Sequence, residues 1–164
     1  MSPGYSDPVK SRAELLQVLD DVCADVLESA IGEAQVAERL VVVASSPGAI
    51  EHASGTEAYS GGNVVAFVND SGVPFVEQSD DLLAKVSGLD PEAVLLGGSA
   101  LVGRAGASFR KVLAVQLFSA VHGLRITRIA PVEETNDVIS SVAAWRDVKP
   151  GPPVWVERLL EQGL

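Results

Sequence analysis

The sequence predicts an α/β domain with three layers, in which a mostly parallel sheet is flanked by helices, as in Rossmann-like or flavodoxin-like folds. Two observations lead to this fold class. Three apolar runs, at 40–44, 64–68 and 93–96, lack the polar alternation of a half-exposed strand, which is typical of strands buried on both faces of a parallel sheet. Segments with helical patterns separate these runs, and such alternation indicates a doubly wound domain.

The length and composition predict one domain with a real core, because 47% of the 164 residues are hydrophobic. We expect a flexible arm over 1–10, a single α/β domain over 11–148, and a proline-rich linker with a short helix over 149–164. No run approaches the roughly 18 apolar residues that span a bilayer. The N-terminus carries no secretory signal pattern. We therefore expect a soluble protein, with the virion, the cell surface and the cytoplasm all open as its location.

The first helix is predicted to begin at Ser11, because the S-R-A-E sequence of residues 11–14 is a capping box. A single apolar stripe follows at helical spacing; its members are Leu15, Leu19, Val22 and Val26. This stripe either covers the sheet or forms the seam between copies of the chain. The single cysteine, Cys23, falls inside the same helix and is expected to be a buried structural thiol.

Three further helices are expected at 79–86, 108–121 and 134–145. The second of them has a wide apolar face, formed by Phe109, Val112, Leu113, Val115, Leu117 and Phe118. The alternating segment 124–129 is expected to be a strand at an edge of the sheet.

The Gly97-Gly98 pair, which follows an apolar run, raises the question of a phosphate cradle. The Gly-x-Gly-x-x-Gly spacing is missing, and no acidic residue stands about 20 positions on to hold a ribose. We therefore predict a tight structural turn there. The two histidines and the one cysteine are scattered, so neither a metal nor another cofactor is expected. The sequence also lacks a recognisable nucleophile–base pair, so we predict no catalytic activity.

The net charge of −10 opposes binding to nucleic acid or to anionic membranes, and no membrane insertion is expected, but the charge is unevenly distributed along the chain. No acidic residue lies between Glu92 and Glu133. The same stretch contains five basic residues, Arg104, Arg110, Lys111, Arg125 and Arg128. They form either a solvated face or a patch that binds an anionic polymer or an acidic partner surface.

Residues 40–103 resemble the cell wall-binding repeat of bacterial surface proteins. The resemblance lies in LVVVASSPGAIEHA, in the Val73-Pro74 step, in Leu82-Leu83, and in the run from Ala93 to Val102 with its Gly-Gly pair. The segment 128–145 is similar to a degraded start of a next repeat. The Asp-Arg-Tyr, Thr-Ala and Asp-Ala-Leu elements of the family are missing.

The resemblance implies a non-catalytic binding or assembly module of α/β fold. Repeats of this family usually occur in threes behind a signal peptide, whereas this chain has one repeat and no signal. A bacteriophage virion component, such as a decoration or tail protein, would fit that departure. A single repeat also needs partner surfaces, so we expect a homotrimer or another closed ring. The alternative is a small α/β enzyme that binds a phosphorylated ligand at Gly97-Gly98.

Overall fold

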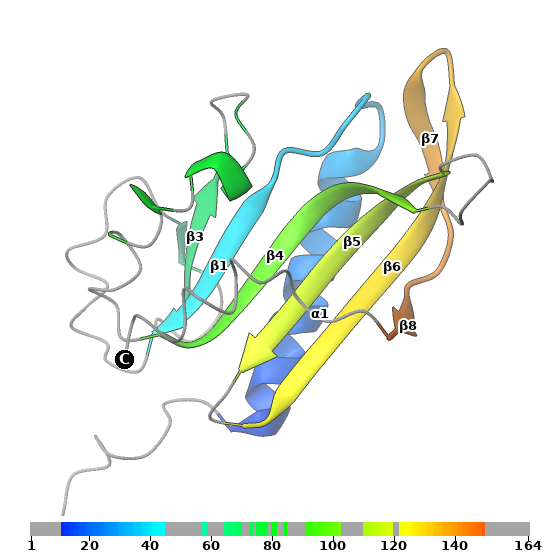
Figure 1. Cartoon of the computed structure of the whole chain (residues 1–164). Helices are drawn as coiled ribbons and strands as arrows, with labels where there is room; N and C mark the ends of the chain where they lie inside the picture. The colour runs from blue at the N-terminus through cyan, green and yellow to red at the C-terminus, as the bar shows by residue number, and fades with distance from the viewer. Residues whose placement is uncertain are drawn as a thin grey trace, which may run out of the picture.

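The chain forms an antiparallel sheet that curves around one long helix (Figure 1). The computed structural model describes residues 11–44, 57–58, 64–69, 73, 75–78, 80–81, 84, 91–102, 110–119 and 122–149. Its elements are α1 (Arg12–Ala30), β1 (Arg39–Ala44), β2 (Glu57–Ala58), β3 (Val64–Val68), the 3₁₀ helix η3 (Phe75–Gln78), β4 (Pro91–Val102), β5 (Arg110–Ser119), β6 (Leu124–Thr135), β7 (Val138–Val142) and β8 (Arg146–Val148). The predicted arm over 1–10 and the proline-rich stretch from residue 150 on lie outside the described residues.

The predicted parallel α/β fold is wrong. The strand order is β2-β3-β1-β4-β5-β6-β7, with β8 also paired to β6, and every pairing is antiparallel. Strands were correctly expected at 40–44, 64–68, 93–96 and 124–129, but β4 and β6 are each 12 residues long. The strand expected at an edge, β6, is internal, because β5 pairs with one side of it and β7 and β8 with the other.

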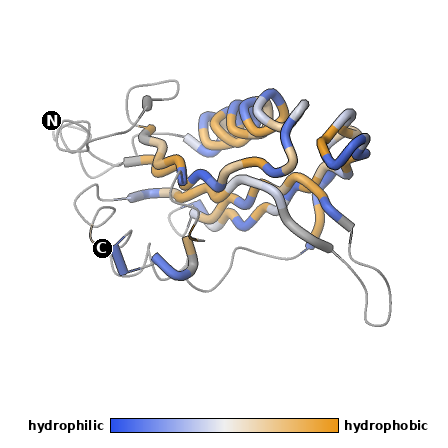
Figure 2. The backbone as a smooth tube through the Cα atoms, turned by 90° about the horizontal axis from the view of Figure 1, so that it is seen from above, coloured by the Kyte–Doolittle hydropathy of each residue, from blue (hydrophilic) through white to orange (hydrophobic). Residues whose placement is uncertain are grey.

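Burial on both faces of the sheet explains why antiparallel strands have the sequence pattern of parallel ones. On the helix-side face, Val41 and Leu95 are fully buried beneath α1, whereas Leu40 and Val94 are equally buried on the outer face. Neighbouring residues of a strand point to opposite faces, so a strand buried on both sides has a continuous apolar run whichever way its partners run. Figure 2 shows α1 lying along one side of the sheet.

The first helix confirms the prediction made from its local sequence. The Ser11 Oγ accepts the Glu14 N–H at 3.2 Å, and the Glu14 carboxylate accepts the Ser11 N–H at 3.1 Å, which completes the capping box. The stripe is fully buried against the sheet; its members are Leu15, Leu19, Val22 and Val26. The stripe therefore covers the sheet, and of its two expected roles the seam between copies is the wrong one.

The helix predicted over 108–121 is wrong, because residues 110–119 form β5. In β5, Leu113, Val115 and Leu117 are fully buried on the helix-side face, and Val112 is buried on the outer face. With both faces apolar, the strand has no period-2 signal, and its pattern also fits a helix with a wide apolar face.

The helix predicted over 134–145 is wrong as well, because this segment forms the β6–β7 hairpin and the chain leading to β8. Thr135 pairs with Val138, so the loop consists of Asn136 and Asp137 alone. Both have positive φ, 54° and 66°, which is the backbone of a type I′ turn. Of the helix expected at 79–86, Asp80, Asp81 and Ala84 are described, and all three are helical.

The turn predicted at Gly97-Gly98 is also wrong, because both glycines lie inside β4. A Cβ on Gly97 would stand 3.0 Å from a methyl carbon of Val26 in α1 and 3.5 Å from Arg39 and Val115 side-chain carbons. A glycine within a strand often marks such a close approach. Gly97 therefore lets α1 pack directly on the centre of the sheet.

An ion pair between Arg39 and Asp25 joins β1 to α1 beside this contact. The Arg39 side chain is 7% exposed, and the register pairs Arg39 with Gly97 on the helix-side face. The missing side chain of Gly97 leaves room for the Arg39 stem. Among the described buried side-chain nitrogens and oxygens, Arg39 Nε has no hydrogen-bond partner.

Replacing Gly97 by alanine is expected to destabilise the fold by about 1–3 kcal/mol, because the added Cβ overpacks Val26. The double variant Gly97→Ala/Val26→Ala should lose less than the sum of the two single losses, since Val26→Ala removes the methyl group that is overpacked. Urea unfolding of the four proteins measures this coupling. Strictly additive losses would contradict the close contact.

Replacing Asp137 by glycine is expected to raise the free energy of unfolding by up to about 1 kcal/mol. Glycine adopts the positive φ of this turn position without the steric cost that a side chain imposes. Asp137→Val, a β-branched residue at the same position, should lower stability instead. Thermal unfolding of both variants checks the sign, and a more stable valine variant would disprove the assigned turn.

Candidate functional site

The five basic residues, for which a solvated face and a single patch were the alternatives, are not gathered on one face where the structure describes them. Arg104 lies outside the described residues, and Arg110 is described as the first residue of β5. Lys111 and Arg128 lie on the helix-side face, whereas Arg125 lies opposite Phe118 on the outer face, with its guanidinium 5.2 Å from the ring centre.

Lys111 and Arg128 are both engaged by groups within the chain. The Lys111 ammonium donates to the Ala34 carbonyl at 2.8 Å and to the Glu134 carboxylate at 3.2 Å. Arg128 bridges α1 and β8, because its guanidinium donates to Asp20 of α1 at 2.5 Å and to Asp147 of β8 at 3.0 Å. These two cations stabilise the packing of the elements around α1.

Cys23 is a buried thiol beside Arg128. It is 3% exposed, as expected for a structural cysteine. Burial raises the pKa of the thiol to about 11, against the opposing charge and hydrogen bond of Arg128. Partial burial disfavours the Arg128 charge, but the hydrogen bonds to Asp20 and Asp147 raise the pKa of Arg128 above its ordinary value. The thiol is therefore neutral and shielded at neutral pH, unlike a nucleophile.

The described surface charges differ between the two ends of the sheet. Four exposed carboxylates surround the β6–β7 hairpin and the end of α1, namely Glu33, Glu133, Glu134 and Asp137. We call this region the acidic end. It also carries Ile31, which is 52% exposed. The backbone of Gly32 and Glu33 bonds to Ile139 of β7, so these segments form one surface.

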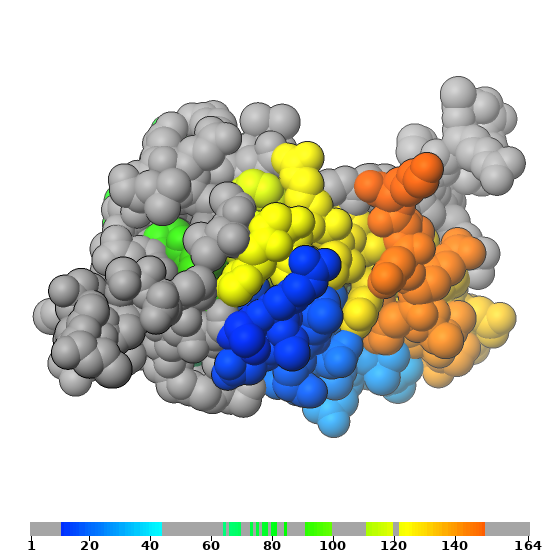
Figure 3. Space-filling model, turned by 90° about the horizontal axis from the view of Figure 1, so that it is seen from below, coloured from blue at the N-terminus to red at the C-terminus, as the bar shows by residue number. Residues whose placement is uncertain are grey.

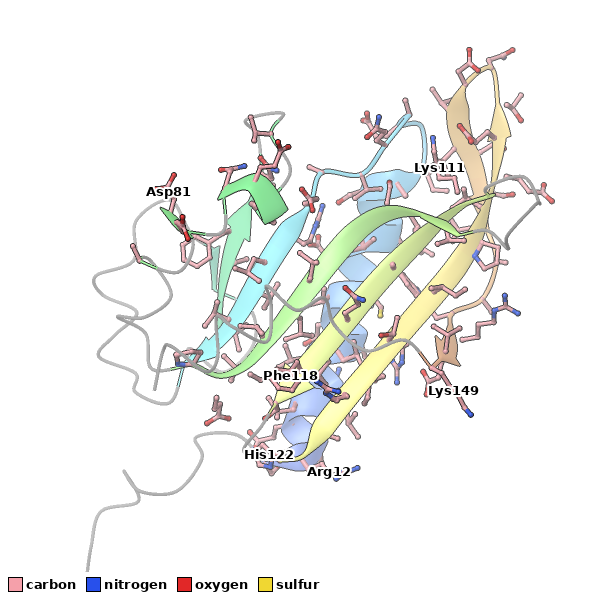
Figure 4. The ribbon with its side chains drawn as sticks, viewed as in Figure 1. Arg12, Asp81, Lys111, Phe118, His122 and Lys149 are labelled. Carbon is pink, nitrogen blue, oxygen red and sulfur yellow. The ribbon has the colours of Figure 1, made fainter. Side chains whose placement is uncertain are left out.

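The opposite end of the sheet, which we call the basic end, carries two exposed cations, Arg12 at the start of α1 and Lys149 after β8. The exposed carboxylates beside them are engaged within the chain, because Glu14 accepts the Ser11 N–H and Asp147 accepts from Arg128. Figure 4 places Arg12 beside His122, at the other end of the sheet from Lys111, and Figure 3 shows the start of α1 lying against β6. Arg125 and Glu134 are nine residues apart on β6, which separates the two ends by about 30 Å.

A groove of about 460 Å³ opens where β1 separates from β4. The β1–β4 ladder ends at the Arg39–Gly97 pair, and beyond it the Val36 N–H donates to the Ser99 Oγ at 2.8 Å. Gly98 lets the segment before β1 pass close to β4, because a Cβ on Gly98 would stand 3.3 Å from the Glu38 Cα. Six of the lining residues are Val36, Ala37, Glu38, Asn69, Val73 and Ser99, and we call the space the Glu38 groove.

Glu38 is the charged residue of the Glu38 groove among its described lining. One carboxylate oxygen, Oε1, accepts the Phe75 N–H at 2.9 Å and the Asn69 side-chain amide at 3.2 Å. The Asn69 N–H donates to the Glu38 carbonyl at 2.8 Å. These bonds tie the chain around η3 to the start of β1 and hold the carboxylate in one orientation. The other oxygen, Oε2, has no partner within the described part of the chain.

Nothing in the linear sequence marked the Glu38 groove as a site. Glu38 precedes a strand, Asn69 follows another, and Ser99 lies in the middle of a third. None of these positions matches a motif with fixed spacing. The groove exists because two ladders place three separate segments side by side.

The described residues contain no group of three or more side chains suited to bind a metal ion. Within the same residues, no helix is both long and apolar enough to cross a membrane. Comparisons with protein-family models, with curated proteins and with solved structures found no match for this chain. The resemblance to the cell wall-binding repeat thus rests on the sequence patterns alone, and the α/β fold that it implied is wrong.

The raised pKa of Cys23 predicts a stability difference that depends on pH. The unfolded thiol ionises near pH 9 and the folded one near pH 11, so the contribution of the neutral thiol is complete below pH 9 and is lost as the pH rises to about 11. Relative to Cys23→Ala, the wild type should lose roughly 2–3 kcal/mol of unfolding free energy between pH 8 and pH 11.

Urea titrations of both proteins at the two pH values measure this loss, and the alanine variant corrects for all other titrating groups. A stability gap that stays constant with pH would contradict the buried neutral thiol.

Proposed function

We propose that this chain is a non-catalytic module that assembles with further copies of itself. The observation that carries the proposal is an exposed isoleucine, Ile31, among the carboxylates of the acidic end, with the exposed cations Arg12 and Lys149 at the other end of the sheet. An apolar side chain with a charged rim is the usual anatomy of a protein interface.

The basic end of a second copy is the complementary partner for the acidic end. Because the two surfaces differ, the contact is heterologous, and it produces a ring when the rotation between copies closes. Three copies is the number that the resemblance implies. A cell surface or a virion as the setting of this assembly is likewise an expectation from the resemblance.

Ile31 contributes most of the contact energy in this proposal. Burying an isoleucine is worth about 1.5–3 kcal/mol, whereas an exposed ion pair is worth roughly 0–1 kcal/mol. The charges set the orientation and speed of the encounter, so association should weaken as salt rises.

The alternative function, an enzyme that binds a phosphorylated ligand at Gly97-Gly98, loses the turn on which its phosphate site depended. It required a turn at Gly97-Gly98 whose backbone N–H groups converge on a phosphate. Both glycines lie within the β4 strand, in register with Val115 and Ala114 of β5. That the chain has no catalytic activity stays a prediction from the sequence.

Light scattering across a concentration and salt series tests the assembly. The wild type is expected to exceed the mass of one chain at micromolar concentration, and Ile31→Ser should weaken association by at least about tenfold. Val68→Ser is the matched control, because Val68 is 49% exposed and lies on β3, at the other side of the sheet. A wild type with the mass of one chain would overturn the proposal.

A charge exchange identifies the two surfaces. One variant carries Glu33→Lys and Glu133→Lys, and the other carries Arg12→Glu and Lys149→Glu. Each should associate poorly alone because like charges face one another, whereas an equimolar mixture should regain association through the exchanged pair of ends. A mixture that behaves as the sum of its parts would exclude this pair of surfaces.

A further inference from the structure

We propose that the Glu38 groove is a binding site for a primary alkylammonium group, with the Glu38 carboxylate as its counter-ion. The proposal does not depend on self-assembly. It rests on the fixed orientation of the carboxylate, on the lack of a basic side chain among the described lining and on the apolar residues that share this lining.

The fixed orientation of Glu38 is the first observation. Two donors, the Phe75 N–H and the Asn69 amide, hold Oε1 and thereby hold the whole carboxylate. This structural role accounts for one oxygen. It leaves Oε2 without a partner in the described part of the chain, on a half-buried acid that lines the groove. A pre-oriented acceptor costs less entropy when it binds a donor than a mobile one does.

Ser99 is a further polar residue of the described lining. Its Oγ accepts the Val36 N–H, and a hydroxyl oxygen has a second lone pair for another donor. A carboxylate matches an ammonium, which carries three donors and no acceptor. An anionic ligand would meet the Glu38 charge with no Lys or Arg among the described lining to offset it.

Three residues of the described lining are apolar and can contact a short aliphatic stem next to the charge, beside the polar Gln35 and Asn69. Val36 is buried, and Ala37 and Val73 are exposed, with Val73 at 43%. Each CH₂ group buried against such walls strengthens binding by about threefold to fourfold. A volume of about 460 Å³ is ample for a butylammonium ion or the end of a lysine side chain.

The binding test is a titration followed by the backbone amide NMR signals of Val36, Gly98 and Ser99. It uses the full chain in the Ile31→Ser background, so that failure of self-assembly cannot affect the result. The probe is n-butylammonium, and n-butanol is its uncharged counterpart. We expect saturable shifts with a dissociation constant of about 1–10 mM, which salt weakens. Butanol should not produce these shifts.

Glu38→Gln separates the proposed site from the structural role of Glu38. Its amide oxygen still accepts the Phe75 and Asn69 donors, so an unchanged Phe75 amide signal would show that the local fold is intact. Binding of n-butylammonium should weaken by at least about tenfold. Glu33→Gln removes the same charge from the same loop, outside the described lining, and should leave binding nearly unchanged.

The source of the ammonium is distinguished by a second probe, Nα-acetyl-lysine amide. Binding at least as tight as that of n-butylammonium would indicate a lysine side chain of a partner, and clearly weaker binding would indicate a free amine. Equal shifts with butanol, unchanged affinity in Glu38→Gln, or no saturable shift with n-butylammonium at about 50 mM would each overturn the site.

Discussion

The close contact between α1 and β4 at Gly97 is the constraint on which the rest of the structure depends. With no side chain at this position, Val26 lies directly on the backbone of the strand, and the apolar stripe of α1 meets the helix-side face along its length. The sheet curves toward α1 along one side of the helix, so β6 and β7 also contribute to the same core through Val132 and Ile139. A larger residue at Gly97 would separate the two layers at their centre.

The adjacent glycines link the core to the Glu38 groove. Successive residues of a strand serve opposite faces. Gly97 admits the helix and the Arg39 stem on one face, and Gly98 lets Glu38 approach the backbone next to it. The same dipeptide therefore lies against both the buried Arg39–Asp25 pair and Glu38, the acid of the groove. Stability and the candidate site are determined by neighbouring positions of a single strand.

Internal pairing of the basic side chains shapes the described surface. Arg39, Lys111 and Arg128 each donate to a carboxylate from another part of the chain, in each case across a junction between elements. Such pairs fix the relative positions of elements more than they add net stability. In a chain of net charge −10 they leave most exposed charges of the described surface negative, and the four carboxylates of the acidic end are among them.

The sequence by itself determined the features that depend on neighbours along the chain. The capping box and the apolar stripe were sufficient for α1, and the β-branched runs located the cores of β1, β3 and β4. Strand direction, the identity of β5 and the hairpin were decided by the tertiary structure. A run buried on both faces carries no period to distinguish helix from strand or parallel from antiparallel. The Glu38 groove joins residues from three segments, and its contacts exist only after the antiparallel ladders have set their register.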